Sequence, residues 1–285
     1  MTDAILTLEN VSYRYPDATR ALDSCSLTIR RASRTVVLGV NGAGKTTMFL
    51  HLNGILRPSA GQVLYAGIPL DYSRAAMRTL RSRVGLVFQN PDSQLFSASV
   101  REDVSFGPMN LGLEEAEVRL RVEESLLAVG MTESADRPVH NLSYGQKKRV
   151  CIAGVLAMRP EILVLDEPMA GLDAAMQEEL MIVLEQLHTA GMTIIIATHD
   201  LDFAYGWADE ALVMEGGRLL AHGSPAEILL RDDVQGSLGG APLVAEISRR
   251  LSLIGIDLRD KGYLPRSKSD LLKAIATQTR RENIL

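Results

Sequence analysis

Short and nearly continuous runs of apolar residues recur along the chain and alternate with segments of helical periodicity. The runs are rich in β-branched residues, which is typical of strands buried on both faces of a parallel sheet. Between them, 118–129 and 176–187 repeat apolar residues at helical spacing, and a glycine follows each. This alternation predicts an α/β fold. The predicted strands are TVVLG (35–39), VGLVF (84–88), ILVLD (162–166), TIIIAT (193–198) and ALVM (211–214).

Two regions interrupt this alternation. Residues 1–31 contain segments such as ILTLENVSYRY, in which the apolar pattern predicts antiparallel strands. Residues 91–159 contain no strong strand pattern and are mainly helical, which predicts a helical subdomain inserted into the core. A hairpin is expected where Gly216 and Gly217 lie between ALVM and the segment RLLAHG.

The last part of the chain has a different pattern. We expect a short helix in SPAEI with Ser224 as its N-cap. Residues 231–245 carry several Gly, Asp and Pro residues, which are typical of a linker, and a helical tail capped by Ser267 follows. These patterns divide the chain into a domain at 1–230 and a linker with a C-terminal segment at 231–285.

Composition and charge narrow the classes of function. With 46% hydrophobic and 23% charged residues, the chain of 285 residues has an ordinary globular composition. A net charge of -5 gives no electrostatic argument for a nucleic-acid partner or for anionic lipid. Cys25 and Cys151 make no disulfide framework, which fits a reducing cytosol. The start lacks a signal-peptide pattern, and no apolar run approaches the roughly 20 residues that cross a bilayer.

The segment GVNGAGKTT (39–47) fits the phosphate-loop pattern G-x-x-x-x-G-K-[ST]. It follows a predicted strand and precedes a predicted helix, where backbone N–H groups and the helix N-terminus bind phosphates. A glycine-rich turn with a chance lysine is the alternative. In the phosphate-loop interpretation, a lysine neutralises the terminal phosphates and a threonine hydroxyl ligates Mg²⁺. The loop residues expected to bind nucleotide are Asn41, Gly42, Gly44, Lys45, Thr46 and Thr47.

Polar residues follow two other predicted strands. Asp166 and Glu167 end ILVLDE, at the sheet edge where α/β proteins bind ligands. We expect Asp166 to hold Mg²⁺ and Glu167 to act on an attacking water as a general base. His199 follows TIIIAT and is expected to face the same site. The alternatives are solvated loop acids and a structural histidine.

Three further residues are ambiguous when taken alone. Gln89 follows VGLVF, where its side chain is expected to reach a metal-bound water, or it is simply a polar strand-end residue. Asp173 in AGLD is either a nucleotide-site residue or the N-cap of the next helix. Tyr15 in YRYP is expected to stack on an adenine ring, and a half-buried strand tyrosine is the alternative.

The segment LSYGQKKRV (142–150) permits two compatible interpretations. Ser143 and Gln146 have the S-x-x-Q spacing of a capping box, which predicts the start of a helix. A capped helix N-terminus with Gly145 in its first turn is also suited to contact phosphate.

In this order, the motifs resemble those of ATP-binding-cassette (ABC) ATPases. The correspondences are Walker A at 39–47, Q-loop Gln89, the signature LSYGQ, Walker B at 162–167, the D-loop GLD and the switch His199. The resemblance covers about residues 5–225 and implies a P-loop NTPase (RecA-like) core that hydrolyses ATP. It also implies two ATPase subunits facing head to tail, in which Ser143 and Gly145 contact the γ-phosphate of the partner's nucleotide. Tyr144 departs from the family pattern because it replaces the usual glycine.

A narrower resemblance concerns residues 88–113 and the signature, which look like those of energy-coupling-factor (ECF) importer ATPases. It implies a membrane-embedded coupling subunit, a substrate-capture subunit and a place at the cytoplasmic face of the membrane. Cobalt or nickel is the favoured cargo and vitamins are the alternative; the second ATPase is an identical copy or a paralogue. The tail resembles that group's C-terminal segment, which helps the ATPases pair. A soluble ABC ATPase and a non-hydrolysing regulatory module are the rival classes.

Overall fold

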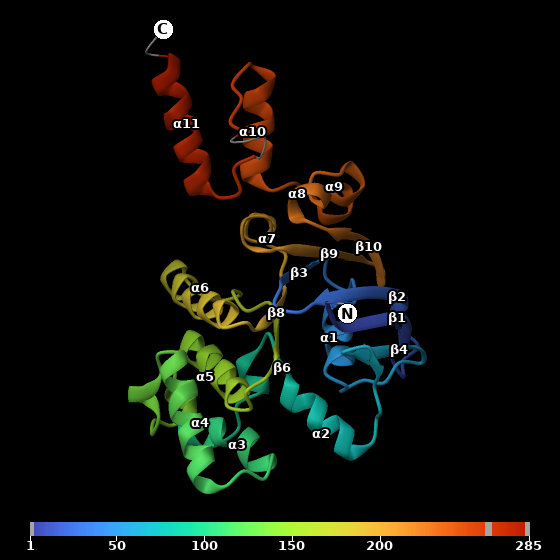
Figure 1. Cartoon of the computed structure of the whole chain (residues 1–285), viewed down its shortest axis with the longest axis vertical. Coiled ribbons are helices and arrows are strands. Elements are labelled where there is room, and N and C mark those ends of the chain that lie inside the picture. The colour runs from blue at the N-terminus through green and yellow to red at the C-terminus, as the bar shows by residue number, and fades with distance from the viewer. Residues whose placement is uncertain (1–2, 260–263, 283–285) are drawn as a thin grey trace.

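The computed structural model describes residues 3–259 and 264–282, and Figure 1 shows their arrangement. Residues 1–2, 260–263 and 283–285 lie outside the described residues. The predicted domain at 1–230 and the predicted C-terminal region at 231–285 each contain some of these positions. Across the described part of the chain, every helix is too short or too polar to cross a membrane.

A six-stranded sheet forms the centre of the molecule (Figure 1). Its neighbouring strands pair in parallel except at one edge, where a hairpin turning at Gly216 and Gly217 adds an antiparallel strand. The five predicted buried strands are all in this sheet, which confirms the α/β prediction. In spatial order the strands are β10 (Arg218–Gly223), β9 (Glu210–Glu215), β3 (Arg34–Leu38), β8 (Thr193–Ala197), β7 (Ile162–Asp166) and β6 (Val84–Val87).

Alternate residues of these strands enter two different hydrophobic cores. In β7, Leu163 and Leu165 belong to one core, whereas Ile162 and Val164 belong to the other. Successive side chains of a strand point to opposite faces, so a strand buried on both faces needs an unbroken apolar run. This requirement explains the continuous hydrophobicity of the five runs.

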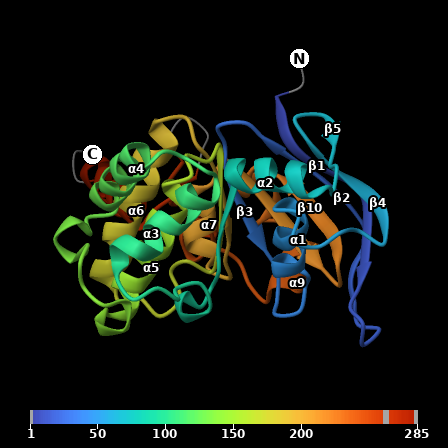
Figure 2. The ribbon, with the colours of Figure 1, turned by 90° about the horizontal axis from the view of Figure 1, so that it is seen from below.

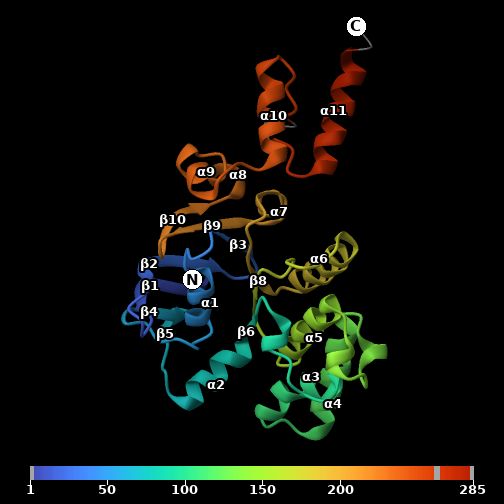
Figure 3. The ribbon, with the colours of Figure 1, turned by 180° about the vertical axis from the view of Figure 1, so that it is seen from behind.

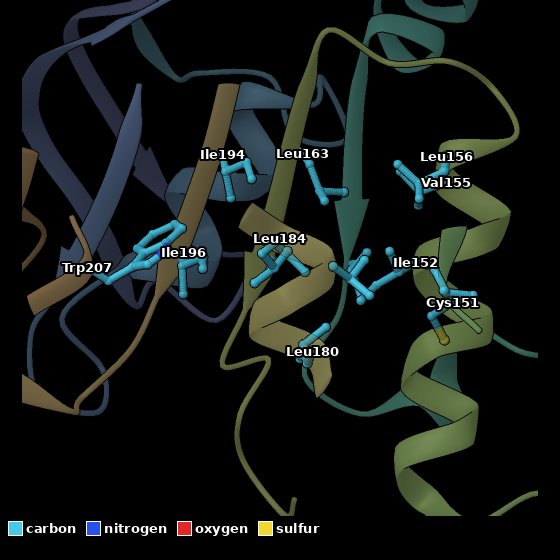
Figure 4. Packing of buried hydrophobic residues seen from close by; sticks show 14 of the residues in the cluster. Cys151, Ile152, Val155, Leu156, Leu163, Leu180, Leu184, Ile194, Ile196 and Trp207 are labelled. Carbon is cyan, nitrogen blue, oxygen red and sulfur yellow. The ribbon is translucent and has the colours of Figure 1, made fainter. Parts of the chain in front are cut away.

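Helices cover both faces of the central sheet. One face carries α1 (Lys45–Leu52) and α2 (Arg74–Arg83). The other carries α5 (Tyr144–Leu156), α6 (Ala174–Thr189) and α7 (Leu201–Trp207). Figure 4 shows side chains of α5 and α6 packed with residues of β7 and β8 on this second face.

The predicted antiparallel strands form a second sheet in the order β2-β1-β4-β5 (Figure 2). The first two strands, β1 (Ala4–Arg14) and β2 (Arg20–Arg30), agree with the prediction for 1–31. The sequence pattern missed β4 (Ala60–Tyr65) and β5 (Ile68–Pro69). Only Val63 of β4 is fully buried, so this strand carries no apolar run.

Residues 91–159 are helical where they form regular structure, as expected, and lie together on one side of the molecule (Figures 2 and 3). Besides α5 they contain α3 (Val100–Asn110) and α4 (Glu115–Ala128), with short 3₁₀ turns at Pro91–Ser93, Thr132–Ser134 and Val139–Asn141.

Residues 231–245, which the sequence pattern predicts to be a linker, contain helical structure. This segment contains α9 (Asp232–Leu238) and the start of α10 (Leu243–Leu253), after the predicted short helix α8 (Pro225–Ile228). The residues that suggested a linker mark helix boundaries: two aspartates occupy the first turn of α9, and Gly239 is its left-handed C-cap. The tail helix α11 (Lys268–Glu282) lies beside α10 (Figure 1), and the Ser267 hydroxyl accepts a hydrogen bond from the N–H of Asp270, as predicted.

The packing of α5 on β6 generates a stability prediction. A Cβ at Gly85 would overlap Cγ1 of Val155, which is fixed on the buried face of α5. Because the core has no room for it, Gly85→Ala is expected to lower the free energy of unfolding by about 1–3 kcal/mol. Urea denaturation measures this change.

Gly236→Ala in α9 is the matched control, because a Cβ there would meet no atom within 4 Å. It is expected to leave stability unchanged or to raise it by up to about 1 kcal/mol, since alanine favours helix. Equal urea midpoints for the two variants would contradict the packing argument.

Candidate functional site

The parallel register brings the predicted site residues to one edge of the central sheet. Strands β3, β8, β7 and β6 are successive neighbours that run in the same direction, so their carboxyl ends share that edge. The phosphate-loop segment, His199, Asp166 with Glu167, and Gln89 come at or directly after these four ends. Ligands of open α/β sheets bind in this position.

The phosphate-loop segment turns from β3 into α1. Gly44 is the N-cap of α1 with φ 102°, and a Cβ there would lie 2.5 Å from the carbonyl oxygen of Ala21. A side chain at this position would therefore be strained and would also clash with the antiparallel sheet. The buried Lys45 folds back over the loop, where its ammonium donates to the carbonyls of Gly39 (2.6 Å) and Val40 (3.3 Å). The loop thus gathers a positive charge at a helix N-terminus.

Thr46 and Asp166 come together from different elements. The Thr46 hydroxyl donates to Oδ2 of Asp166 over 2.6 Å, and Asp166 is only 6% exposed. Among the described residues, no group of three or more His, Cys, Asp or Glu side chains forms a metal site. A hydroxyl beside one carboxylate fits Mg²⁺, which is typically held by one or two protein oxygens together with substrate phosphates and water.

Glu167 and His199 form a contact pair. Nδ1 of His199 lies 3.0 Å from Oε2 and 3.2 Å from Oε1 of the Glu167 carboxylate. The imidazole is largely exposed, whereas the carboxylate is mostly shielded. Glu167 has a left-handed backbone with φ 46°, and its N–H donates to the carbonyl of Ala197 on β8. A carboxylate held against an imidazole beside a phosphate loop is suited to orient a water.

Tyr15 lies against the helix that follows the loop. Its hydroxyl is 3.1 Å from the hydroxyl of Thr47, and its ring meets Tyr13 edge to face. The half-buried tyrosine is therefore next to the phosphate loop, but these contacts also give it a structural role. Gln89 is exposed at the end of β6, and its backbone carbonyl accepts a hydrogen bond from Tyr144.

The start of α5 has the predicted capping box. The Ser143 hydroxyl accepts from the N–H of Gln146, and the Gln146 side chain accepts from the N–H of Ser143. Tyr144 packs within its own chain: its hydroxyl donates to the carbonyl of Gln89, and its ring lies beside Gly171. The tyrosine is exposed, but both of these contacts are made within its own subunit.

Gly145 and Asp173 both have intrachain roles in the geometry. A Cβ at Gly145 would lie 2.7 Å from Sδ of Met176 on α6, so α5 approaches α6 closely at this point. Asp173 is the N-cap of α6, and its carboxylate accepts from the N–H of Met176 over 2.9 Å. The alternative interpretation of Asp173 as a helix N-cap thus explains the position of its carboxylate.

The fold does not bring the signature segment to the phosphate loop of the same chain. The two helices that follow these segments, α5 and α1, pack on opposite faces of the sheet. Figures 1 and 3 show α1 with the antiparallel sheet and α5 with the other helices of 91–159.

Sequence reasoning missed Lys148, which is buried between α5 and the turn after β7 and donates to three carbonyls there. The helical spacing could have indicated its burial, because Gly145, Lys148 and Ile152 lie on one face of the helix. Lysine is seldom fully buried, so the residue type alone does not indicate this position.

Known proteins are similar to this chain in sequence and in fold. A family model described as "ABC transporter" matches residues 22–170. The chain is 46% identical to the energy-coupling factor transporter ATP-binding protein EcfA of Methanothermobacter thermautotrophicus, over 94% of this chain and 86% of that protein. It is 47% identical to the cobalt import ATP-binding protein CbiO of Rhodobacter capsulatus, over 97% of this chain and 99% of that protein.

Solved structures of related proteins have the same fold. CbiO1 of Clostridium perfringens, described as part of the ABC transporter complex CbiONQ, matches with a TM-score of 0.75 and 46% identity, over 89% of this chain and 98% of that chain. A dimeric ATP-binding cassette, MJ0796, bound to ADP and Pi matches with a TM-score of 0.70 and 26% identity, over 78% of this chain and 99% of that chain.

The position of Tyr15 yields a prediction that separates stacking from hydrogen bonding. Tyr15→Ala is expected to weaken ATP binding by about 1–3 kcal/mol, because stacking of a base on an aromatic ring contributes about that much. Tyr15→Phe keeps the ring, loses only the contact with Thr47, and is expected to bind ATP nearly as well as the unchanged chain. Titration calorimetry with a non-hydrolysable ATP analogue measures both; equal losses in the two variants would refute the stacking role.

Proposed function

Because the chain belongs to the ABC transporter family and, within it, to the ATP-binding subunits of ECF-type importers, we propose that it drives cobalt import by ATP hydrolysis. The observation that carries the choice of cobalt is the 47% identity to a cobalt import ATP-binding protein along almost the whole of both chains. Nickel is the second candidate cargo, since it shares the predicted branch, and a vitamin is the third.

In the proposed mechanism, a water attacks the γ-phosphate of ATP in line with the leaving group, and the protein mainly positions and stabilises charge. Glu167 orients and deprotonates the water, while His199 holds the carboxylate and reaches the γ-phosphate. Lys45 exchanges the loop carbonyls for the phosphate oxygens, whose charge it offsets. Thr46, Asp166 and Gln89 would hold Mg²⁺, which would supply positive charge to offset that of the phosphates.

A second ATPase subunit completes each site in this proposal. Ser143 is exposed at the capped start of α5, which packs on the face of the sheet opposite to α1. The N-terminus of α5 is therefore available to a nucleotide held by another copy or a paralogue. A helix N-terminus favours negative charge. The dimeric state of the related cassette with ADP and Pi supports this arrangement. The intact motif set permits a homodimer.

Residues 1–230 would act as the ATPase domain, and the segment 231–285 would help the subunits pair. In support, α10 and α11 share a small core of Val244, Leu258 and Leu271 and also expose leucines at their surface. Exposed apolar side chains on two packed helices favour a partner surface.

A membrane-embedded coupling subunit, working with a substrate-capture subunit, is the proposed mechanical partner at the cytoplasmic face. A cleft of about 930 Å³ lies between α2, the end of β6 and the helices of 91–159. It includes part of the segment QNPDSQLF (89–96) and two exposed rings, Phe96 and Phe106, whose centroids are 4.7 Å apart. An amphipathic helix in an apolar groove is a common docking mode. Movement of the helical region during the ATP cycle would then reach the membrane protein.

Glu167→Gln tests the general-base assignment. Glutamine keeps the size and hydrogen-bonding ability of the side chain but cannot accept the proton from water. ATP hydrolysis is therefore expected to fall by about 10²-fold or more, while ATP binding persists and traps a closed dimer. Phosphate release measures the first effect and size-exclusion chromatography with ATP the second.

The control is Glu123→Gln, which removes an exposed carboxylate from α4. It is expected to keep full turnover. Full turnover in Glu167→Gln as well would remove Glu167 from the base role.

The transport proposal is tested by uptake of radiolabelled Co²⁺ into proteoliposomes that hold the chain with its membrane partners. Uptake is expected to require ATP and to stop in Glu167→Gln. Phe106→Ala is expected to lower uptake by about tenfold while hydrolysis by the isolated chain persists, because central aromatic anchors dominate interfaces. Leu127→Ala, an exposed apolar residue of α4 outside the cleft lining, is the control. Uptake of Ni²⁺ or a vitamin instead of Co²⁺ would replace the proposed cargo.

A further inference from the structure

The two neighbouring lysines of LSYGQKKRV have different environments. Lys147 lies near the surface, where its ammonium forms an ion pair of 2.7 Å with the exposed Asp92. Lys148 is 2% exposed and lies on the face of α5 that is turned into the molecule. Successive side chains of a helix are rotated by about 100° about its axis, so Lys147 points to the surface while Lys148 points into the molecule.

The buried ammonium of Lys148 is held by the main chain. It donates to the carbonyls of Glu167 (3.0 Å), Pro168 (2.7 Å) and Ala170 (2.7 Å). An ammonium has three donors, so these carbonyls satisfy all of them. Burial lowers the pKa of Lys148 to about 8, and the Glu167 carboxylate opposes this shift. Burying a charge costs free energy unless its hydrogen bonds are satisfied. The three carbonyls therefore stabilise the Lys148 ammonium, and the ammonium in turn holds these carbonyls in place.

The turn held by Lys148 is the one that presents Glu167. A left-handed backbone at a non-glycine residue is strained and persists only where the surroundings fix it. Here the N–H of Glu167 donates to the carbonyl of Ala197. The carbonyl of Glu167 accepts from both the Lys148 ammonium and the N–H of Ala170. Without the ammonium, the carbonyls of Pro168 and Ala170 would lose this donor, and the carbonyl of Glu167 would keep only the N–H of Ala170.

We propose that Lys148 is a positioning residue for hydrolysis: it fixes the Glu167 turn so that the carboxylate stays against His199. The inference rests on the proposed role of Glu167. Lys148 also ties this turn to α5, and it is only five residues after the capped Ser143. A displacement of the start of α5 therefore reaches the general base through one side chain, within the same subunit.

The test compares Lys148→Met and Lys148→Gln in the full-length protein. Methionine keeps the stem of the side chain and removes all donors, whereas glutamine retains two. Lys148→Met is expected to lower kcat for ATP at least about tenfold, because a misplaced catalytic group loses much of its effect. The KM for ATP is expected to stay within about twofold, since the phosphate loop is unchanged. Lys148→Gln is expected to recover part of kcat.

Lys147→Met is the matched control and is expected to keep kcat, since its ion pair is near the surface. Thermal denaturation with ATP present identifies a temperature at which each variant is folded, and kinetics are measured there. If Lys148→Met unfolds, the comparison of Lys148→Gln with the unchanged chain decides, and a full kcat in Lys148→Gln with a lowered melting temperature overturns the proposal. A raised KM with unchanged kcat in either variant also overturns it.

The double variant Lys148→Met, Glu167→Gln separates this inference from the proposed function. If Lys148 acts through Glu167, the second substitution adds little to the loss caused by Glu167→Gln. Additive losses overturn the positioning role. Full turnover in Glu167→Gln alone is a failure of the proposed function, whatever Lys148→Met does.

Discussion

The structure depends on the parallel pairing of the central strands. The hydrogen-bond ladder fixes β3, β8, β7 and β6 in register, so residues more than a hundred positions apart follow strand ends at one edge. The 2.6 Å contact between Thr46 and Asp166 is possible because α1 begins at that edge beside the end of β7. Loops alone would not hold such geometry, whereas strands buried on both faces provide a rigid support.

This sheet builds one half of the proposed reaction site, and in the proposed dimer the signature segment supplies the other half to a second subunit. The phosphate loop, the acidic strand end and His199 converge within one chain. The signature segment instead begins a helix on the opposite face of the sheet. In this proposal hydrolysis depends on assembly of the two subunits, which suits the proposed coupling of ATP turnover to movement.

The central fold and the converging site were predictable from the sequence because each buried strand carries its own apolar run. The capping box at Ser143 was equally readable, since its partners are three residues apart. Other features had no local signal. Strand β4 is mostly exposed, and α9 is short, polar and bounded by the aspartates and glycine that suggested a linker. Lys148 depends on carbonyls about twenty residues away, and the direction of the Tyr144 ring depends on Gln89; neither contact follows from residue type.

The close approach at Gly145 has a consequence for how the subunit deforms. With Met176 against the first turn of α5, and Asp173 capping the helix that carries Met176, the beginnings of α5 and α6 form one block. Neither helix can slide past the other at this point without displacing the Met176 side chain. A protein surface that displaces Ser143 would therefore also displace Asp173. The starts of α5 and α6 would move together and not independently.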